Sequence, residues 1–122
     1  MGQRKEESGR TQADHRRTLR SPLIVLQARQ DAGRSTFFGY AKNISRGGMF
    51  IASINPAVPG SRFSVEFPLP GRRETRVQCQ CEVVWHRPFS KRGIYEPGMG
   101  LRFIDLPVDS GLAIDTWANA PD

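Results

Sequence analysis

Long apolar segments are missing from this sequence of 122 residues. No run approaches the roughly 18 apolar residues that a membrane-spanning helix requires. The amino-terminal residues are polar and charged, so they also lack the apolar centre of a secretory signal. We therefore expect no membrane insertion and a cytoplasmic localisation.

Cysteine and histidine are scarce, with two of each in the chain. Cys79 and Cys81 stand two positions apart, so on a strand they would share one face, and close neighbours of this kind rarely form a disulfide. His15 and His86 lie far apart in the sequence and do not complete a metal-ligand spacing. We therefore expect free thiols, buried or half-buried, and no metal ion.

Residue patterns typical of catalysis are also missing. The sequence contains neither a glycine-rich phosphate-binding loop with its lysine nor a pair of carboxylates flanked by apolar pocket residues. The serines that lie near a histidine in the sequence belong to predicted loops and tails. These observations predict a protein that is not an enzyme and needs no cofactor.

Acidic residues are the minority, 12 against 18 basic residues, and the formal net charge is +6. Fifteen of the 18 basic residues are arginine. The planar guanidinium forms paired hydrogen bonds with phosphate and with the Hoogsteen edge of guanine, and it stacks on flat rings. This bias indicates a phosphorylated or nucleotide partner, although composition alone fits a solvated basic surface equally well.

What the sequence does contain is a series of short runs in which apolar and polar residues alternate, separated by turns rich in Gly, Pro, Asn and Asp. The predicted strands cover 22–29, 35–45, 48–54, 61–69, 75–87 and 99–106. A short amphipathic helix is predicted within 107–120. This order predicts a mainly all-β protein, an antiparallel barrel or sandwich, with Trp85 in its core.

Two polar stretches are candidates for binding. "RRTLR" places Arg16 and Arg20 where the polar tail meets the first predicted strand, so that a flexible segment could fold over a ligand. In "NISRGG", strand alternation would point Asn43 and Ser45 outward together, and the glycines would leave the backbone open to a flat ring. Taken separately, the first stretch fits a solvated tail and the second fits an ordinary strand-to-turn junction.

Together these stretches resemble the PilZ domain family, bacterial receptors for cyclic di-GMP, which are marked by RxxxR before the first strand and [D/N]xSxxG one hairpin later. The resemblance extends over 14–118 and includes "CEVVWHR" and "EPGMGLRFIDL". It implies a six-stranded antiparallel β-barrel of PilZ type with a short C-terminal helix. Residues 1–13 would then be a disordered N-terminal tail and 119–122 a C-terminal tail.

The resemblance also implies the site residues. The cyclic di-GMP contacts carried over from the family are Arg16, Arg20, Asn43, Ser45 and Gly48, and additional candidate contacts are Arg17, Gly47 and Arg87. The arginines would contact phosphates and guanine, Asn43 and Ser45 would hydrogen-bond a guanine edge, and Gly48 would keep the floor of the site open.

Three functions follow as hypotheses. The first is a cyclic di-GMP receptor in which the ligand orders the arginine flap and changes the surface offered to an unidentified protein effector. The second is a PilZ-like adaptor that acts through protein contacts and does not bind nucleotide. The third, a nucleic-acid binder, is disfavoured because the aromatic residues are predicted to alternate into the core instead of forming an exposed stacking stripe.

Overall fold

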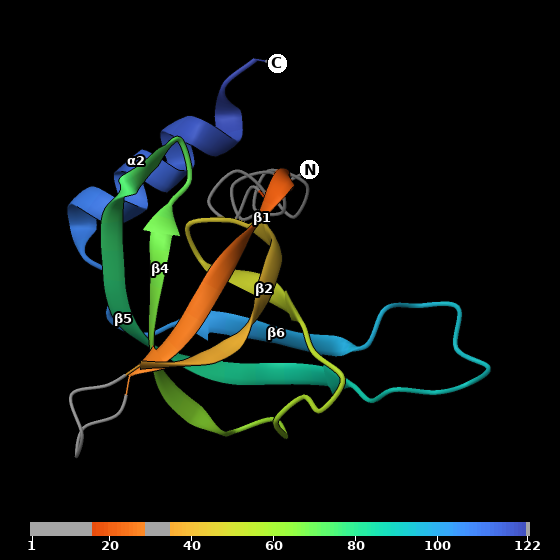
Figure 1. Ribbon diagram of the computed structural model, residues 1–122. Coiled ribbons are helices and arrows are strands. Elements are labelled where there is room, and N and C mark those ends of the chain that lie inside the picture. Colours follow the sequence, from red (N-terminus) through yellow and green to blue (C-terminus); the bar gives the residue numbers. More distant parts are fainter. Residues whose placement is uncertain (1–15, 29–34, 122) are drawn as a thin grey trace, which may run out of the picture.

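Six antiparallel strands form a closed barrel in the computed structural model, which describes residues 16–28 and 35–121 (Figure 1). The strands are β1 (Arg17–Ala28), β2 (Ser35–Ile44), β3 (Gly48–Ala52), β4 (Arg62–Leu69), β5 (Arg72–Arg87) and β6 (Gly98–Phe103). Around the barrel they follow the order β1-β2-β3-β6-β5-β4, and β1 pairs with β4 to close it. The prediction of a six-stranded antiparallel barrel is confirmed, and the β1–β4 pairing joins the two strands that would otherwise be the edges of the sheet.

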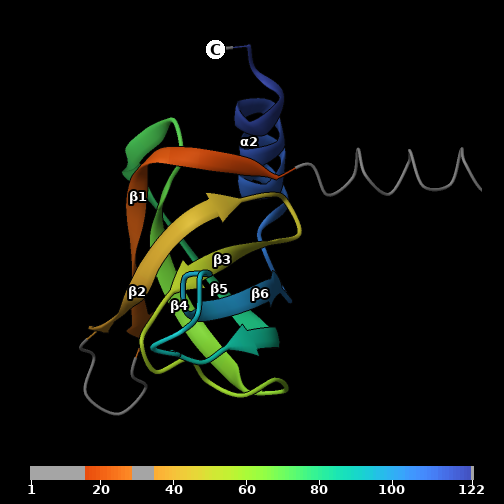
Figure 2. The same cartoon turned by 90° about the vertical axis from the view of Figure 1, so that its right-hand side faces the viewer.

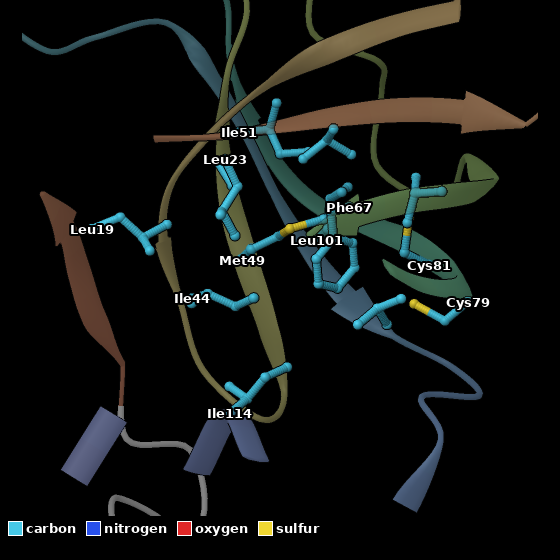
Figure 3. Packing of buried hydrophobic residues seen from close by; sticks show 14 of the residues in the cluster. Leu19, Leu23, Ile44, Met49, Ile51, Phe67, Cys79, Cys81, Leu101 and Ile114 are labelled. Carbon is cyan, nitrogen blue, oxygen red and sulfur yellow. The ribbon is translucent and has the colours of Figure 1, made fainter. Parts of the chain in front are cut away.

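The core lies inside the barrel because alternate residues of each strand point inward. In β5, Val77, Cys79, Cys81 and Val83 are buried, whereas Gln78 and the other residues between them are more exposed. Figure 3 shows Leu23, Ile51 and Phe67 from three further strands meeting in the same cluster.

One end of the barrel is covered by the helix α2 (Val108–Asn119), as Figure 2 shows. Ile114 is fully buried and joins the core, and Trp117 is half-buried against it. The predicted C-terminal helix is therefore confirmed. Among the described residues, no helix has the length and apolar character that crossing a bilayer demands.

The two thiols are free and buried, as the alternation in β5 predicts. Burial raises the pKa of Cys79 to about 12 and that of Cys81 to about 12, because a thiolate would lose its hydration inside the barrel. Neither thiol is therefore a ready nucleophile in the folded protein.

A pH dependence of stability follows from these pKa values. Unfolded thiols ionise at about pH 8.5, whereas the folded ones stay protonated until about pH 12. The free energy of unfolding is therefore expected to fall as the pH rises above about 8.5, since only the unfolded chain then releases these protons. Urea denaturation of the wild type and of Cys79→Ala/Cys81→Ala measures this. Equal slopes of stability against pH in both proteins would contradict it.

The arginine stretch is predicted to be flexible, but the structure places all of it except Arg16 in a strand. β1 begins at Arg17 instead of residue 22, and Arg17 pairs with Ile44 and Thr18 with Asn43. An irregularity between Thr18 and Leu23 then shifts the pairing by several residues. Predicted tail residues 1–13 lie outside the described part of the chain.

The prediction that the aromatic residues point into the core is only partly right. Phe67 is buried, but Phe37, Tyr40 and Trp85 are exposed, Trp85 by 41%. The β5–β6 register shifts between Val83 and Trp85, and this β-bulge turns the indole outward. Trp85 is therefore not a core residue.

Candidate functional site

The turn between β2 and β3 is built around the side chain of Ser45. Its backbone N–H donates to the Gly48 carbonyl over 2.8 Å, and its hydroxyl oxygen accepts from the N–H groups of Gly47 (3.1 Å) and Gly48 (3.3 Å). Ser45 is fully buried, so the prediction that it points outward with Asn43 is wrong. Strand alternation fails here because β2 ends at Ile44 and Ser45 already belongs to the turn.

Gly48 is required by strand packing. It pairs with Arg102 of β6, and a Cβ at this position would overlap the backbone carbonyl of Leu101. Its missing side chain therefore allows β3 to approach β6, and the space beside it is filled by protein backbone. Gly48 is predicted to keep the floor of a binding site open, but in this geometry its missing side chain makes room for β6.

Two aromatic rings lie side by side over a glycine of β6. Phe50 of β3 and Trp85 of β5 both pair with Gly100, from opposite sides. Their rings stack with centroids 5.5 Å apart and planes 15° apart. A Cβ on Gly100 would overlap the indole ring, so only glycine allows this arrangement. We call Phe50 and Trp85 the aromatic ledge.

A cavity of about 590 Å³ lies against the aromatic ledge, within the usual size range of small-molecule sites. We call it the ledge cavity. Its lining residues come from the start of β1 and the residue before it, from β2, β3 and β5, and from the loop before β6: Arg16, Thr18, Lys42, Asn43, Phe50, Trp85, Arg87 and Glu96.

The guanidinium groups in the ledge cavity are held by neutral oxygens and flat rings. Arg16 Nη1 donates to Asn43 Oδ1 over 2.9 Å. Arg87 Nη1 donates to the Glu96 carbonyl over 3.0 Å, and its guanidinium lies 5.3 Å from the ring centroid of Trp85 and 5.0 Å from that of Tyr95. These contacts orient the cations, and neither guanidinium pairs with a carboxylate of the described residues, so both can attract an anion.

The carboxylate in the ledge cavity belongs to Glu96, and its charge is balanced by Lys42. The Lys42 Nζ lies 3.5 Å from Glu96 Oε2, and both side chains are nearly half exposed. Arg16 and Arg87 therefore supply the excess charge, which is positive. A flat ring for stacking beside positive charge suits an anion that carries an aromatic base.

A second cavity of about 570 Å³ lies near the junction of β1, the β4–β5 turn and α2. Its lining residues are Arg17, Thr18, Leu19, Arg20, Ser21, Pro70, Gly71, Arg73 and Trp117. We call it the helix cavity. Thr18 lines both cavities, so the start of β1 separates them.

Arg17 links the end of α2 to the start of β1 through hydrogen bonds. Its Nη1 donates to the carbonyls of Trp117 (2.8 Å) and Ala120 (2.9 Å), and its guanidinium lies 5.2 Å from the ring centroid of Trp117. α2 has no basic residue in its last turn, and Arg17 supplies positive charge at that end. This arrangement gives Arg17 a structural role in the described state.

The structure thus divides the residues that the sequence singled out. Arg16, Asn43 and Arg87 meet in the ledge cavity, whereas Arg17 and Arg20 line the helix cavity. The remaining three, Ser45, Gly47 and Gly48, form the β2–β3 turn and line neither of these cavities.

Sequence reasoning missed the aromatic ledge, Lys42 and Glu96. Strand alternation predicts Trp85 in the core and does not single out Phe50, and only the register of β3 and β5 on Gly100 brings the two rings together. The two glycines of "GMG" in β6 are the one sequence signal for it. A Cβ at Gly98 would overlap Phe50, as one at Gly100 would overlap Trp85.

Comparisons with known proteins agree with this architecture. The family model for the PilZ domain matches residues 14–119. A solved structure of the Bacillus subtilis inhibitor of motility (MotI/DgrA) superposes with a TM-score of 0.64 at 16% sequence identity, covering 86% of this chain and 47% of that protein. The chain therefore spans about half the length of that protein, and the likeness concerns the fold. No curated protein matches the sequence.

Proposed function

The chain belongs to the PilZ domain family, whose members are ligand-binding and adaptor domains, and on that premise we propose that it is a receptor for cyclic di-GMP. The observation that carries the proposal is the ledge cavity, which combines two guanidinium groups with a stacked pair of aromatic rings. Cyclic di-GMP is a dianion with two purine bases. It requires cations for its phosphates and flat surfaces for its bases.

We assign each residue a role from its present contacts. A guanine stacks on Trp85, and Arg87 contacts a phosphate or the guanine edge. Arg16 turns from the Asn43 amide oxygen to a phosphate, and this oxygen then accepts from a guanine N–H group. The ligand therefore replaces an internal hydrogen bond with charge-assisted ones, which are stronger.

Arg20 lies in the helix cavity and needs a rearrangement to reach the same ligand. We propose that the irregular part of β1, between Thr18 and Leu23, repacks on binding so that Arg20 covers the nucleotide. Ser45 and Gly48 contribute by fixing the turn that follows Asn43, and Gly47 closes this turn. The altered β1 surface is then offered to a protein effector in the cytoplasm.

Calorimetric titration with cyclic di-GMP tests the proposal. The wild type is expected to bind, and Arg16→Ala to weaken the affinity by about tenfold because a charge-assisted contact is lost. Arg20→Ala should weaken it by a similar factor if β1 repacks. Arg102→Ala is the matched control, since this exposed arginine pairs with Glu82 on the outside of the barrel, and it should bind as the wild type does.

Other results would support the rival functions. Absence of binding heat with the wild type would favour an adaptor that does not bind nucleotide. Equally tight binding of random single-stranded RNA, weakening steeply with salt, would favour a nucleic-acid binder. Because Phe37 and Tyr40 are exposed and their rings contact each other, this RNA control is needed.

A further inference from the structure

The loop between β5 and β6 carries apolar side chains into solvent. Phe89, Ile94 and Tyr95 are 58%, 86% and 68% exposed, and Ile94 is the most exposed large apolar side chain in the described part of the protein. Figure 1 shows this loop extending far from the barrel, on the side away from α2. Such exposed apolar groups, gathered on one projecting element, mark an interaction surface.

The tip of the same loop is positively charged. Lys91 and Arg92 lie in a turn closed by a 3.0 Å hydrogen bond from the Gly93 N–H to the Ser90 carbonyl, and both are exposed. Neither forms a salt bridge with any described residue. The acidic residue of the loop, Glu96, is paired with Lys42 at its base. We call Phe89, Lys91, Arg92, Ile94 and Tyr95 the finger.

The solvent-exposed face of α2 is complementary to the finger, because it carries apolar side chains beside negative charge. Val108 and Leu112 lie one turn apart on this face and are 71% and 50% exposed, where an amphipathic helix would normally be polar. Ile104, which precedes the helix, is 39% exposed. Asp105 and Asp109 are exposed beside these side chains. We call these five residues the helix patch.

We propose that the finger of one copy of this chain docks on the helix patch of a second copy. The two surfaces match in both respects, since apolar side chains flank cations on one and flank carboxylates on the other. The β5–β6 loop and α2 lie on opposite sides of the molecule in Figure 1, so the loop of one copy does not reach α2 of the same copy. The contact is therefore between molecules and of the head-to-tail type.

A second copy fits the finger better than an anionic membrane does. Membrane-binding basic clusters use about four to eight cations, whereas the finger offers two. The helix patch supplies both the apolar groups and the negative charge that the finger requires. The contact is small, and a net charge of +6 on each copy opposes assembly, so the association is weak and depends on concentration and salt.

Sedimentation velocity of the full chain without nucleotide tests this self-association independently of the proposed binding of cyclic di-GMP. The wild type is expected to sediment faster as its concentration rises from about 10 to about 500 µM, a range over which a contact with a Kd of about 100 µM becomes populated. Ile94→Ser and Lys91→Glu/Arg92→Glu should each weaken the association at least about tenfold. Phe37→Ser is the control that leaves the association unchanged, because it removes from the side of the barrel a ring that is as exposed as that of Phe89.

A mixing experiment identifies the partner surface. Asp105→Asn/Asp109→Lys alters the helix patch, and asparagine keeps the oxygen that accepts from the Gln80 N–H over 2.6 Å. This variant should be monomeric alone and should associate again when mixed with Lys91→Glu/Arg92→Glu, because each supplies the surface that the other lacks. The proposal is overturned by a wild type that stays monomeric, by a mixture that stays monomeric, or by Phe37→Ser acting more strongly than Ile94→Ser.

Discussion

Gly48→Ala is expected to lower the free energy of unfolding by about 3 kcal/mol, the upper part of the range for overpacked sites. The new Cβ would overlap the carbonyl of Leu101, which is backbone and cannot turn aside as a side chain could. To accommodate it, β3 must move away from β6 along the ladder that joins Gly48 to Arg102. Urea denaturation followed by circular dichroism measures the loss.

Gly47→Ala is the matched control for this substitution. Gly47 is the exposed neighbour of Gly48 in the same turn, and its φ lies outside the left-handed region, so its backbone conformation is one that alanine can adopt. Its N–H and carbonyl groups, which bond to Ser45 and Phe103, remain in place. If both variants lose similar stability, the turn conformation matters and close approach of the strands does not.

Trp85→Ala is expected to weaken cyclic di-GMP binding by about 10-fold to 100-fold, because stacking one base on an aromatic ring contributes about 1–3 kcal/mol. The loss of affinity has two sources. The guanine base loses the indole ring on which it stacks, and Arg87 loses the ring, 5.3 Å from its guanidinium, that helps to orient this side chain. Calorimetric titration of the folded variant measures this change.

Two further variants distinguish the loss of base stacking from a nonspecific effect of substitution in β5. Val84→Ala removes part of the neighbouring exposed side chain of β5 and should leave the affinity unchanged. Trp85→Phe keeps a smaller flat ring and should bind with intermediate affinity. If Trp85→Ala binds as tightly as the wild type, the aromatic ledge is not the base platform, and the proposed placement of guanine is wrong.

Residue pattern predicts most of the fold, because barrel strands alternate between core and solvent with a period of two. This rule placed Cys79 and Cys81 inside the barrel, and the structure confirms it. It fails where the backbone departs from regular pairing. Trp85 follows an irregularity in β5, and Ser45 lies one residue past the end of β2.

The candidate site was predictable only in part. The spacing of Arg16 and Arg20 indicated one binding stretch, but in the structure the two arginines line different cavities. Asn43 could be associated with Arg16 through the family resemblance, and their 2.9 Å hydrogen bond shows that they meet. The aromatic ledge could not be foreseen, because it depends on which residues of β3 and β5 lie across from the same glycine.

The sequence by itself determined a basic, arginine-rich chain with six alternating strands, a terminal helix and two buried thiols, since these features depend on local periodicity and composition. Only the tertiary structure decided that Phe50 and Trp85 stack beside Arg87, that Ser45 is a buried turn residue, and that Gly48 touches β6. The physical reason is that strand register and β-bulges arise from contacts between residues far apart in the chain.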